Sequence, residues 1–261
     1  MLTDTPMARQ MVLTALNGVP LIKPGDNLAD IILQAAERSG LGFKKGDLLV
    51  LAQKIVSKAE DRFVNLVTIH PSEEALELAD QTGKDSRLLE VILGESERVL
   101  RAGRGVIIVK HRLGFVCANA GVDHSNIQKD EPGEWVLLLP ENPDSSALKI
   151  REQIRERTGV DVGILIIDSH GRAWRYGTVG ISIGISGVTG LLDLRGTPDL
   201  FGETLKITRV GLADELAAAA SALMGQADEA APIVHIQGAP YHMVEGSLSE
   251  LIRREDKDLF L

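Results

Sequence analysis

The segment from Val160 to Ile167 (VDVGILII) constrains the fold more than any other part of this sequence, because it is apolar on both faces of a strand. Such a run predicts a strand that is buried on both sides, as in parallel-type sheets covered by helices. Asp47 to Ala52 (DLLVLA) predicts another buried strand. Short apolar runs of this kind alternate with helical patterns along the chain. We therefore expect a mixed α/β fold in which mixed sheets are flanked by helices.

Further elements follow from apolar spacing and capping residues. The predicted helices are Ser72 to Gln81, Asp85 to Leu100, Asp144 to Thr158 and Leu212 to Met224, and the predicted strands are Gly105 to Val109, Leu113 to Ala118, Glu134 to Leu139 and Pro232 to Gln237. We expect Asp144 or Ser145 to cap the third helix and Gly159 to end it. Pro140 to Ser146 (PENPDSS) is the best linker candidate, but the strongest chemical motifs lie on either side of it. We therefore expect one functional unit over residues 1–261, with a loose tail at about residues 1–10.

Composition excludes several classes of function. The 261 residues carry a formal charge of −9, which argues against non-specific nucleic-acid binding. Cys117 is the only cysteine, so an intrachain disulfide and a cysteine-based zinc cluster are excluded, and a reducing cytoplasmic setting is the simplest expectation. No apolar run approaches the roughly 18 residues that a membrane span needs, and Met1 to Arg9 lacks the apolar core of a secretory signal.

Two acidic motifs are candidates for metal binding. Asn119 to Asn126 (NAGVDHSN) follows a predicted strand and offers Asp123 as a carboxylate ligand, although Asp, Ser and Asn also favour an ordinary turn. Asp168 follows the buried strand, at the edge where open α/β sheets bind ligands, although it also suits a turn cap. Together the two carboxylates would suit Mg²⁺ or Mn²⁺.

Basic residues and glycines leave more than one interpretation open. Lys54 and Lys58 converge on one anion if their segment is helical, or they form a solvated face. Arg172 and Arg175 are candidates for holding a phosphate or a substrate carboxylate, or they are surface charges. The glycines at 177, 180, 184, 187 and 190 match neither a dinucleotide fingerprint nor a P-loop. They allow close approach of the backbone to a ligand or to another strand, or they serve close packing and bends in a β segment.

Covalent catalysis by the protein has little support in the sequence. Cys117 lies in an apolar strand without an evident base, so we expect a buried, inert thiol. No strand-to-helix nucleophile elbow supports a serine hydrolase, and the histidines show no metal-binding spacing, so we interpret them as mostly structural or exposed.

Taken in order along the chain, these motifs resemble the coenzyme F-420-0:gamma-glutamyl ligase family. The resemblance runs from about Val12 to Ile252. It is carried by Gln53–Glu60 (QKIVSKAE), Leu93–Glu97 (LGESE), Asn119–Asn126, Ile167–Arg172 with Arg175 and Gly177, Gly180–Gly187 (GISIGISG), Leu223–Gln226 (LMGQ) and Pro232–Gly238. The chain departs from the family pattern at Ser169-His170, where Thr-Asn is expected, and at Gln226, where Glu is common. We also expect no nitroreductase-like domain of the kind that is fused to some bacterial relatives.

The resemblance implies a GTP-dependent enzyme that joins L-glutamate to coenzyme F-420-0 by an amide bond and extends the tail through gamma-linkages. It implies two divalent ions, Mg²⁺ or Mn²⁺, with K⁺ as a further ion, and an intertwined homodimer. By the resemblance, Asp123 and Asp168 would bind one metal, and Ser169 and Gln226 a second. The expected GTP contacts are Val19, Pro20, Leu21, Ile22, Gln53, Lys54, Lys58, Asn126, Met224, Gly225, Gln226, Ala227, Asp228, Glu229, Ala230 and Ala231.

The implied chemistry agrees with the residues. GTP would activate a carboxylate as an acyl phosphate, and the glutamate amine would then displace the phosphate. Positioning and charge neutralisation suffice for phosphoryl transfer, so the absence of a protein nucleophile is expected. Three alternatives remain open: a metal-dependent phosphohydrolase that uses the same aspartates, a non-catalytic nucleotide-binding regulator, and a ligase that acts on another carboxylate.

Overall fold

A five-stranded sheet forms the centre of the molecule in this computed structural model, which describes residues 9–127, 129, 131–241 and 243–258. Its order is β1 (Val12–Ala15), β12 (Ile233–Gln237), β2 (Leu48–Ala52), β8 (Gly163–Arg172) and β9 (Arg175–Ser186). Only β2 and β8 run parallel, and the other neighbours are antiparallel. The expected mixed α/β fold is therefore confirmed, although most pairs in this sheet are antiparallel.

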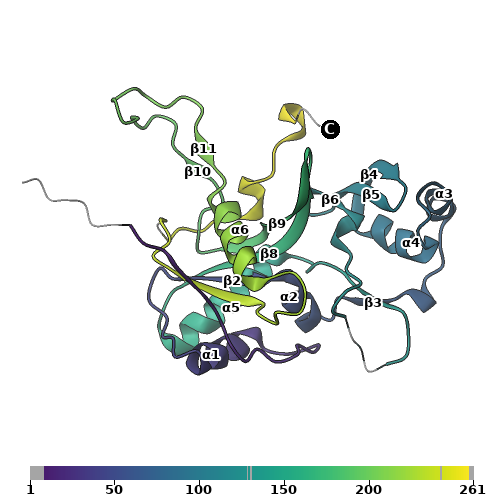
Figure 1. Cartoon of the computed structure of the whole chain (residues 1–261), viewed down its shortest axis with the longest axis horizontal. Helices are drawn as coiled ribbons and strands as arrows, with labels where there is room; N and C mark the ends of the chain where they lie inside the picture. The colour runs from purple at the N-terminus through teal and green to yellow at the C-terminus, as the bar shows by residue number, and fades with distance from the viewer. Residues whose placement is uncertain (1–8, 128, 130, 242, 259–261) are drawn as a thin grey trace, which may run out of the picture.

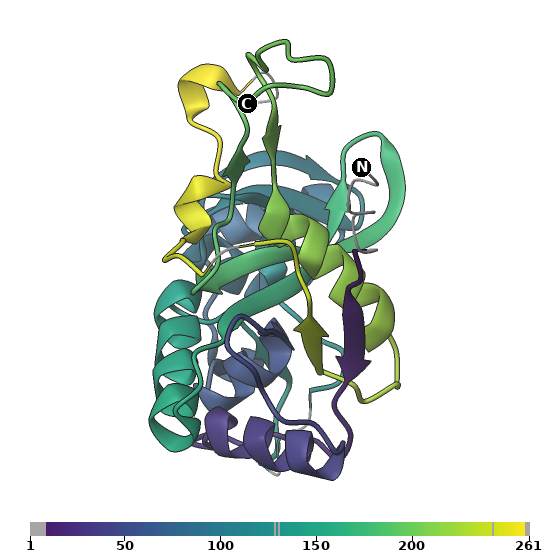
Figure 2. The same cartoon turned by 90° about the vertical axis from the view of Figure 1, so that its left-hand side faces the viewer.

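The two faces of this sheet are both covered by helices, as the apolar runs predicted. Leu49 and Leu51 of β2 pack into the core beneath α1 (Leu28–Arg38) and α5 (Pro143–Thr158). Leu48 and Val50 point the opposite way and pack with α6 (Leu212–Met224). Figure 2 shows α1 (purple) and α5 (teal) on one side of the sheet and α6 (yellow-green) on the other. The residues of β8 alternate between the same two cores, because successive strand residues face opposite ways.

Two glycines of β9 explain how close these helices lie. A Cβ added at Gly180 would stand 2.5 Å from the Cβ of Ser221 in α6. A Cβ at Gly184 would stand 2.6 Å from the carbonyl oxygen of Pro143 in α5. At these two positions the glycines allow close packing, which is one of the interpretations that the sequence leaves open, but the neighbours are helices rather than another strand.

A smaller layer packs beside the central sheet, on the right in Figure 1. It contains the sheet of β4 (Ser96–Gly103), β5 (Val106–His111) and β6 (Val116–Ala118), together with α3 (Glu73–Thr82) and α4 (Ser86–Gly94). The remaining elements are α2 (Gln53–Ala59), β3 (Phe63–Asn65) paired with β7 (Trp135–Leu137), β10 (Leu192–Asp193) paired with β11 (Arg209–Val210), and the short 3₁₀ turns η1 (Leu66–Thr68), η2 (Asn119–Gly121), η3 (Leu248–Glu250) and η4 (Glu255–Lys257).

Several predicted boundaries are wrong. The helix expected over Asp85 to Leu100 ends at Gly94, and Val99 lies in β4, where the chain gains backbone pairing with β5. The strand expected from Leu113 begins only at Val116, because a tight turn after His111 occupies the preceding residues. The buried strand begins at Gly163 rather than Val160.

The start of α5 also differs from the prediction. Asn142 caps this helix by accepting a hydrogen bond from the backbone of Ser145, whereas Asp144 accepts backbone hydrogen bonds from Ile185 and Leu248. Gly159 ends the helix as expected, with a φ of 71°. Residues 1–8 of the expected tail lie outside the described residues.

A long arm leaves the body through β10 and β11 and projects away from the sheet in Figure 1. Leu200, Phe201 and Ile207, which belong to this arm, are each at least 87% exposed. Among the described residues, no helix has the length and apolar character that a membrane crossing requires.

Candidate functional site

A cavity of about 1240 Å³ lies where the carboxyl ends of β2 and the buried part of β8 meet the smaller layer. Its walls come from segments that are far apart in sequence: the loop after β1, α2, the loop after β6, β8 and the end of α6. All the expected GTP contacts line this cavity, and so do Asp123, Asp168 and Ser169. Residues on both sides of Pro140–Ser146 therefore share one site.

Asp123 is fixed in this cavity through both its backbone and its side chain. Its backbone N–H and C=O pair with Leu137, at 2.9 and 3.0 Å. Its Oδ2 accepts a hydrogen bond from Nε2 of Gln53 at 2.7 Å and lies 3.3 Å from Nζ of Lys54. Burial, together with the charge of Asp168, raises the pKa of Asp123. The fold thus holds this carboxylate in a place where its ionised form is disfavoured.

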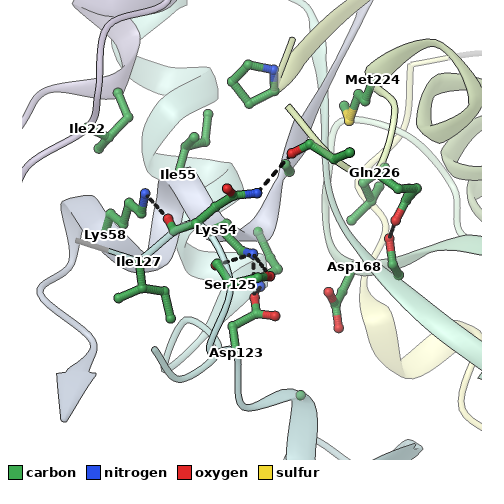
Figure 3. Close-up of a pocket in the computed structure, with 18 of the residues that line it drawn as sticks. Ile22, Lys54, Ile55, Lys58, Asp123, Ser125, Ile127, Asp168, Met224 and Gln226 are labelled. Atoms are coloured by element: carbon green, nitrogen blue, oxygen red, sulfur yellow. Dashed lines mark hydrogen bonds and ion pairs between the residues drawn. The ribbon is translucent and has the colours of Figure 1, made fainter. Parts of the chain in front are cut away.

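Lys54 and Lys58 both lie on α2, so the helical spacing required by the anion-binding interpretation is present. Lys54 donates to the backbone oxygen of Ser125 at 2.9 Å, and Lys58 donates to the backbone oxygen of Asn126 at 2.8 Å. Burial and the neighbouring charge of Lys54 lower the pKa of Lys58. Figure 3 shows both lysines directed at the loop that carries Asp123. Two cations therefore line one wall of the cavity.

The segment after α6 forms the opposite wall. Gly225 ends the helix with a φ of 75°, and the carboxylate of Glu229 occupies the space where a side chain at Gly225 would stand. Oε2 of Glu229 accepts a hydrogen bond from the backbone N–H of Ala227 at 2.8 Å. The side chain of Asn126 donates to the backbone oxygen of Ala227 at 3.0 Å, so the two walls are joined at this point.

Positive backbone φ angles concentrate around the cavity. Among its lining residues, Asn119, Asn126 and Ala230 have φ values of 53°, 54° and 51°. Non-glycine residues adopt this conformation at a cost, and such residues cluster at binding and catalytic sites. In addition, the buried side-chain oxygen of Asn119 has no hydrogen-bond partner within the described part of the chain. The cavity wall therefore contains strained backbone and one buried side-chain oxygen that is available to a ligand.

Asp168, Ser169 and His170 lie within β8, so the expectation that Asp168 follows the strand is wrong in detail. The continuously buried part of the strand ends at Ile167, and the strand continues to Arg172 because β9 pairs with it. Ser169 donates to Oε1 of Gln226 at 2.7 Å, and Nε2 of Gln226 donates to Ser221 of α6 at 3.0 Å. In Figure 3, Asp123 and Asp168 lie on either side of one space, with Gln226 beside the second carboxylate.

Arg172 and Arg175 pair with one another at the tip of the β8–β9 hairpin, and both are exposed. They lie beyond Gly171 and Thr178, which line the cavity, but are not themselves lining residues. The structure therefore does not bring the two arginines to the aspartates, and their role in holding a substrate stays a prediction.

The donor set suits a hard divalent cation. Asp123, Asp168, Ser169 and Gln226 all offer oxygen atoms to the same cavity, and oxygen is the ligand atom that Mg²⁺ and Mn²⁺ prefer. No group of three His, Cys, Asp or Glu side chains within the described residues converges on one point, so substrate oxygens and water would complete the coordination. These residues fit the metal ions implied by the resemblance.

Two further reactive side chains, Cys117 and His170, lie beside Asp168. Cys117 is buried, as predicted, and burial together with the charge of Asp168 raises the pKa of its thiol to about 12. His170 was interpreted with the other histidines as structural or exposed, yet its Nε2 lies 2.9 Å from Oδ2 of Asp168. Its position two residues after Asp168 was the available signal, because residues two apart on a strand share a face.

Comparison with known proteins agrees with the family that the motifs resemble. The sequence profile of the family described as F420-0:Gamma-glutamyl ligase matches residues 18–238. A protein of Methanopyrus kandleri named Coenzyme F420:L-glutamate ligase is 47% identical over 249 residues, which cover 93% of this chain and 95% of that protein. The protein of the same name from Methanothermobacter thermautotrophicus is 44% identical over 250 residues, with 95% and 98% covered. The chain belongs to the F420-0:gamma-glutamyl ligase family.

Proposed function

We propose that this protein is a GTP-dependent ligase that joins L-glutamate to coenzyme F420-0 by an amide bond and extends the product through gamma-linkages. The observation that supports this most is the convergence of the expected GTP contacts with Asp123 and Asp168 around a single cavity. Its volume of about 1240 Å³ exceeds the roughly 300–1,000 Å³ typical of a site for one small molecule. A nucleotide and an acceptor can therefore occupy it together.

Binding of the triphosphate is the first step of the proposed mechanism. Lys54 and Lys58 neutralise phosphate charge from α2, and the backbone around Gly225 to Ala231 encloses the nucleotide from the opposite wall. Asp123, Asp168, Ser169 and Gln226 would hold divalent ions, which supply charge neutralisation for phosphoryl transfer when they are bound. Gln53 and Lys54 keep Asp123 oriented toward this space.

Amide formation follows in two steps. The terminal carboxylate of F420-0 attacks the γ-phosphorus of GTP, GDP leaves, and an acyl phosphate forms. The amine of L-glutamate then attacks the acyl carbon, phosphate leaves with the C–O electron pair, and the ammonium proton is released. Water must be excluded meanwhile, because it would hydrolyse the acyl phosphate. No protein nucleophile is required, which agrees with the buried, weakly acidic thiol of Cys117.

Isotope transfer tests this proposal directly. F420-0 carrying ¹⁸O in its terminal carboxylate is incubated with GTP, Mn²⁺ and L-glutamate, and the masses of the products are measured by mass spectrometry. We expect each amide formed to add one glutamate and to pass one ¹⁸O to phosphate. Unlabelled phosphate with accumulating amide would refute the acyl phosphate. Phosphate release at the same rate without F420-0 and glutamate would favour the phosphohydrolase, and no turnover with tight GTP binding would favour the regulator.

We further propose that the protein forms a homodimer. The β10–β11 arm exposes Leu200, Phe201 and Ile207 well away from the core, and clustered exposed apolar side chains mark interaction surfaces. The family resemblance points to a second copy of this chain as the occupant. A mass of 28.1 kDa by light scattering at micromolar concentration would contradict the dimer.

A further inference from the structure

Three aromatic rings form a row that ends at Asp168. His111 of β5 stacks on Phe115 with ring centres 5.1 Å apart, and Phe115 meets the edge of His170 at 5.2 Å. His111 is fully buried, and Phe115 and His170 are 8% and 7% exposed. His170 is therefore fixed by ring packing from the smaller layer, although it belongs to a hairpin of the central sheet.

The far end of this row lies beside a charged group. Nδ1 of His111 accepts a hydrogen bond from the backbone of Leu113 at 3.0 Å, and its Nε2 lies 3.7 Å from Glu95. Glu95 is itself held by Arg62 and Arg112, each at 3.0 Å. Burial lowers the pKa of His111 to about 4, so this ring stays neutral at physiological pH. The LGESE motif, which contains Glu95, thus lies at the end of the row rather than in the cavity itself.

The near end of the row meets the carboxylate. Asp168 and His170 lie two residues apart on β8 and share one face of the strand, whereas Ser169 points to the other side and contacts Gln226. Nε2 of His170 lies 2.9 Å from Oδ2 of Asp168. Within the described residues, Oδ1 of Asp168 has no hydrogen-bond partner, so one carboxylate oxygen is held and the other is left for a ligand.

We propose that His170 is a positioning residue for Asp168: its Nε2–H donates to Oδ2 and fixes the carboxylate so that Oδ1 is presented to the cavity. This inference rests on the proposed function, because it assigns Asp168 a ligand in the same site. Hydrogen bonds to a coordinating carboxylate set its orientation, and removing such a partner usually weakens metal affinity or activity by about 10- to 100-fold. His170 itself touches neither the substrate nor a metal ion in this account.

Two matched variants separate the hydrogen bond from the packing. His170→Phe keeps an aromatic ring against Phe115 but has no N–H, whereas His170→Gln loses the ring but keeps an N–H donor at the end of its side chain. We expect His170→Phe to weaken Mn²⁺ binding, measured by electron paramagnetic resonance, and kcat by about 10- to 100-fold, with the thermal unfolding midpoint changed by only a few degrees. We expect His170→Gln to recover most of the loss. Wild-type Mn²⁺ affinity and kcat in His170→Phe, or an equal loss in both variants, would overturn the proposal.

A second measurement does not depend on turnover. In ¹⁵N spectra of the imidazole groups, recorded without substrates, His170 should be the Nε2–H tautomer with a hydrogen-bonded proton, and Asp168→Asn should shift that proton signal. A His170 found as the Nδ1–H tautomer, or one unaffected by Asp168→Asn, refutes the assignment. If wild-type protein fails to ligate glutamate while the Mn²⁺ and ¹⁵N results hold, the proposed function fails and the positioning role stands.

Discussion

Gly180→Ala tests whether the contact between β9 and α6 sets the geometry of the cavity. The added Cβ would stand 2.5 Å from Cβ of Ser221 and 2.9 Å from the backbone oxygen of Ala217. Carbon atoms in contact are normally about 3.5–4.0 Å apart, so the helix must move by roughly 1 Å. Backbone and Cβ atoms cannot rotate away, and the strain must therefore be taken up by displacement of α6.

The cost of this substitution follows from the displacement. Overpacking of this kind destabilises proteins by about 1–3 kcal/mol, which lowers the unfolding midpoint of a chain of this size by roughly 2–12 °C. Ser221 also accepts the hydrogen bond from Gln226, which in turn accepts from Ser169. A shift of about 1 Å disturbs this chain of contacts, and misplacement of that size can reduce the rate about 100-fold.

The assay pairs calorimetry with turnover measured well below the unfolding midpoint. Gly103→Ala is the matched control, because Gly103 also lies in a strand and its added Cβ would meet nothing within 4 Å. We expect the control to change stability by less than about 1 kcal/mol and to leave kcat unchanged. If Gly180→Ala behaves like the control, then α6 is not held at the distance the structure describes, and our explanation of this wall is wrong.

Three further outcomes are expected. Asp123→Asn should abolish ligation yet raise the unfolding midpoint at pH 7, because burial and the charge of Asp168 raise the pKa of Asp123 in the folded chain. Ionisation of Asp123 lowers the stability of the wild-type protein, and this loss grows as the pH rises from 3.8 through the raised pKa of the folded chain. The higher unfolding midpoint of Asp123→Asn should therefore approach that of the wild type in thermal melts at pH 5 and pH 4. Lys54→Met should raise KM for GTP by about 10-fold or more, because a charge-assisted hydrogen bond to the nucleotide is lost. The control Lys149→Met, on α5, should leave this KM unchanged. Native Cys117, with its pKa raised to about 12, should stay unreactive toward a disulfide reagent at pH 8 and react once the chain is unfolded.

The central sheet was the most predictable part of the fold. Continuous apolar runs can be satisfied only by burial on both faces, so the sequence of β2 and of the first half of β8 determines their environment. Helix ends with a strong local signal, such as Gly159 and Gly225, were also predicted at the residues where they occur. In each of these cases the nearby residues were sufficient to predict the structure.

The predictions failed where tertiary pairing overrides local pattern. The segment after Gly94 has apolar residues at helical spacing, yet it becomes β4 because β5 offers backbone partners along most of its length. Asp168 looked like a strand end because the apolar run stops at Ile167, but β9 extends the pairing to Arg172. His170 was missed for a related reason: its ring partner Phe115 lies in the turn between β5 and β6 of a different sheet, and no residue near His170 in sequence indicates this contact.

The two carboxylates of the site are held by different parts of the fold, and this determines how their separation is controlled. Asp123 is anchored to β7 and α2, whereas Asp168 is carried by β8 and meets the smaller layer through His170 and Phe115. Neither anchor alone fixes the distance between the carboxylates, because each anchor holds only one of them and a contact must join the two parts of the fold. The ring row makes that contact beside Asp168, and the bond from Asn126 to Ala227 makes another across the cavity. A site assembled in this way needs its connecting contacts as much as its ligands, so conservative changes at Phe115 should disturb the chemistry of Asp168 without touching any substrate.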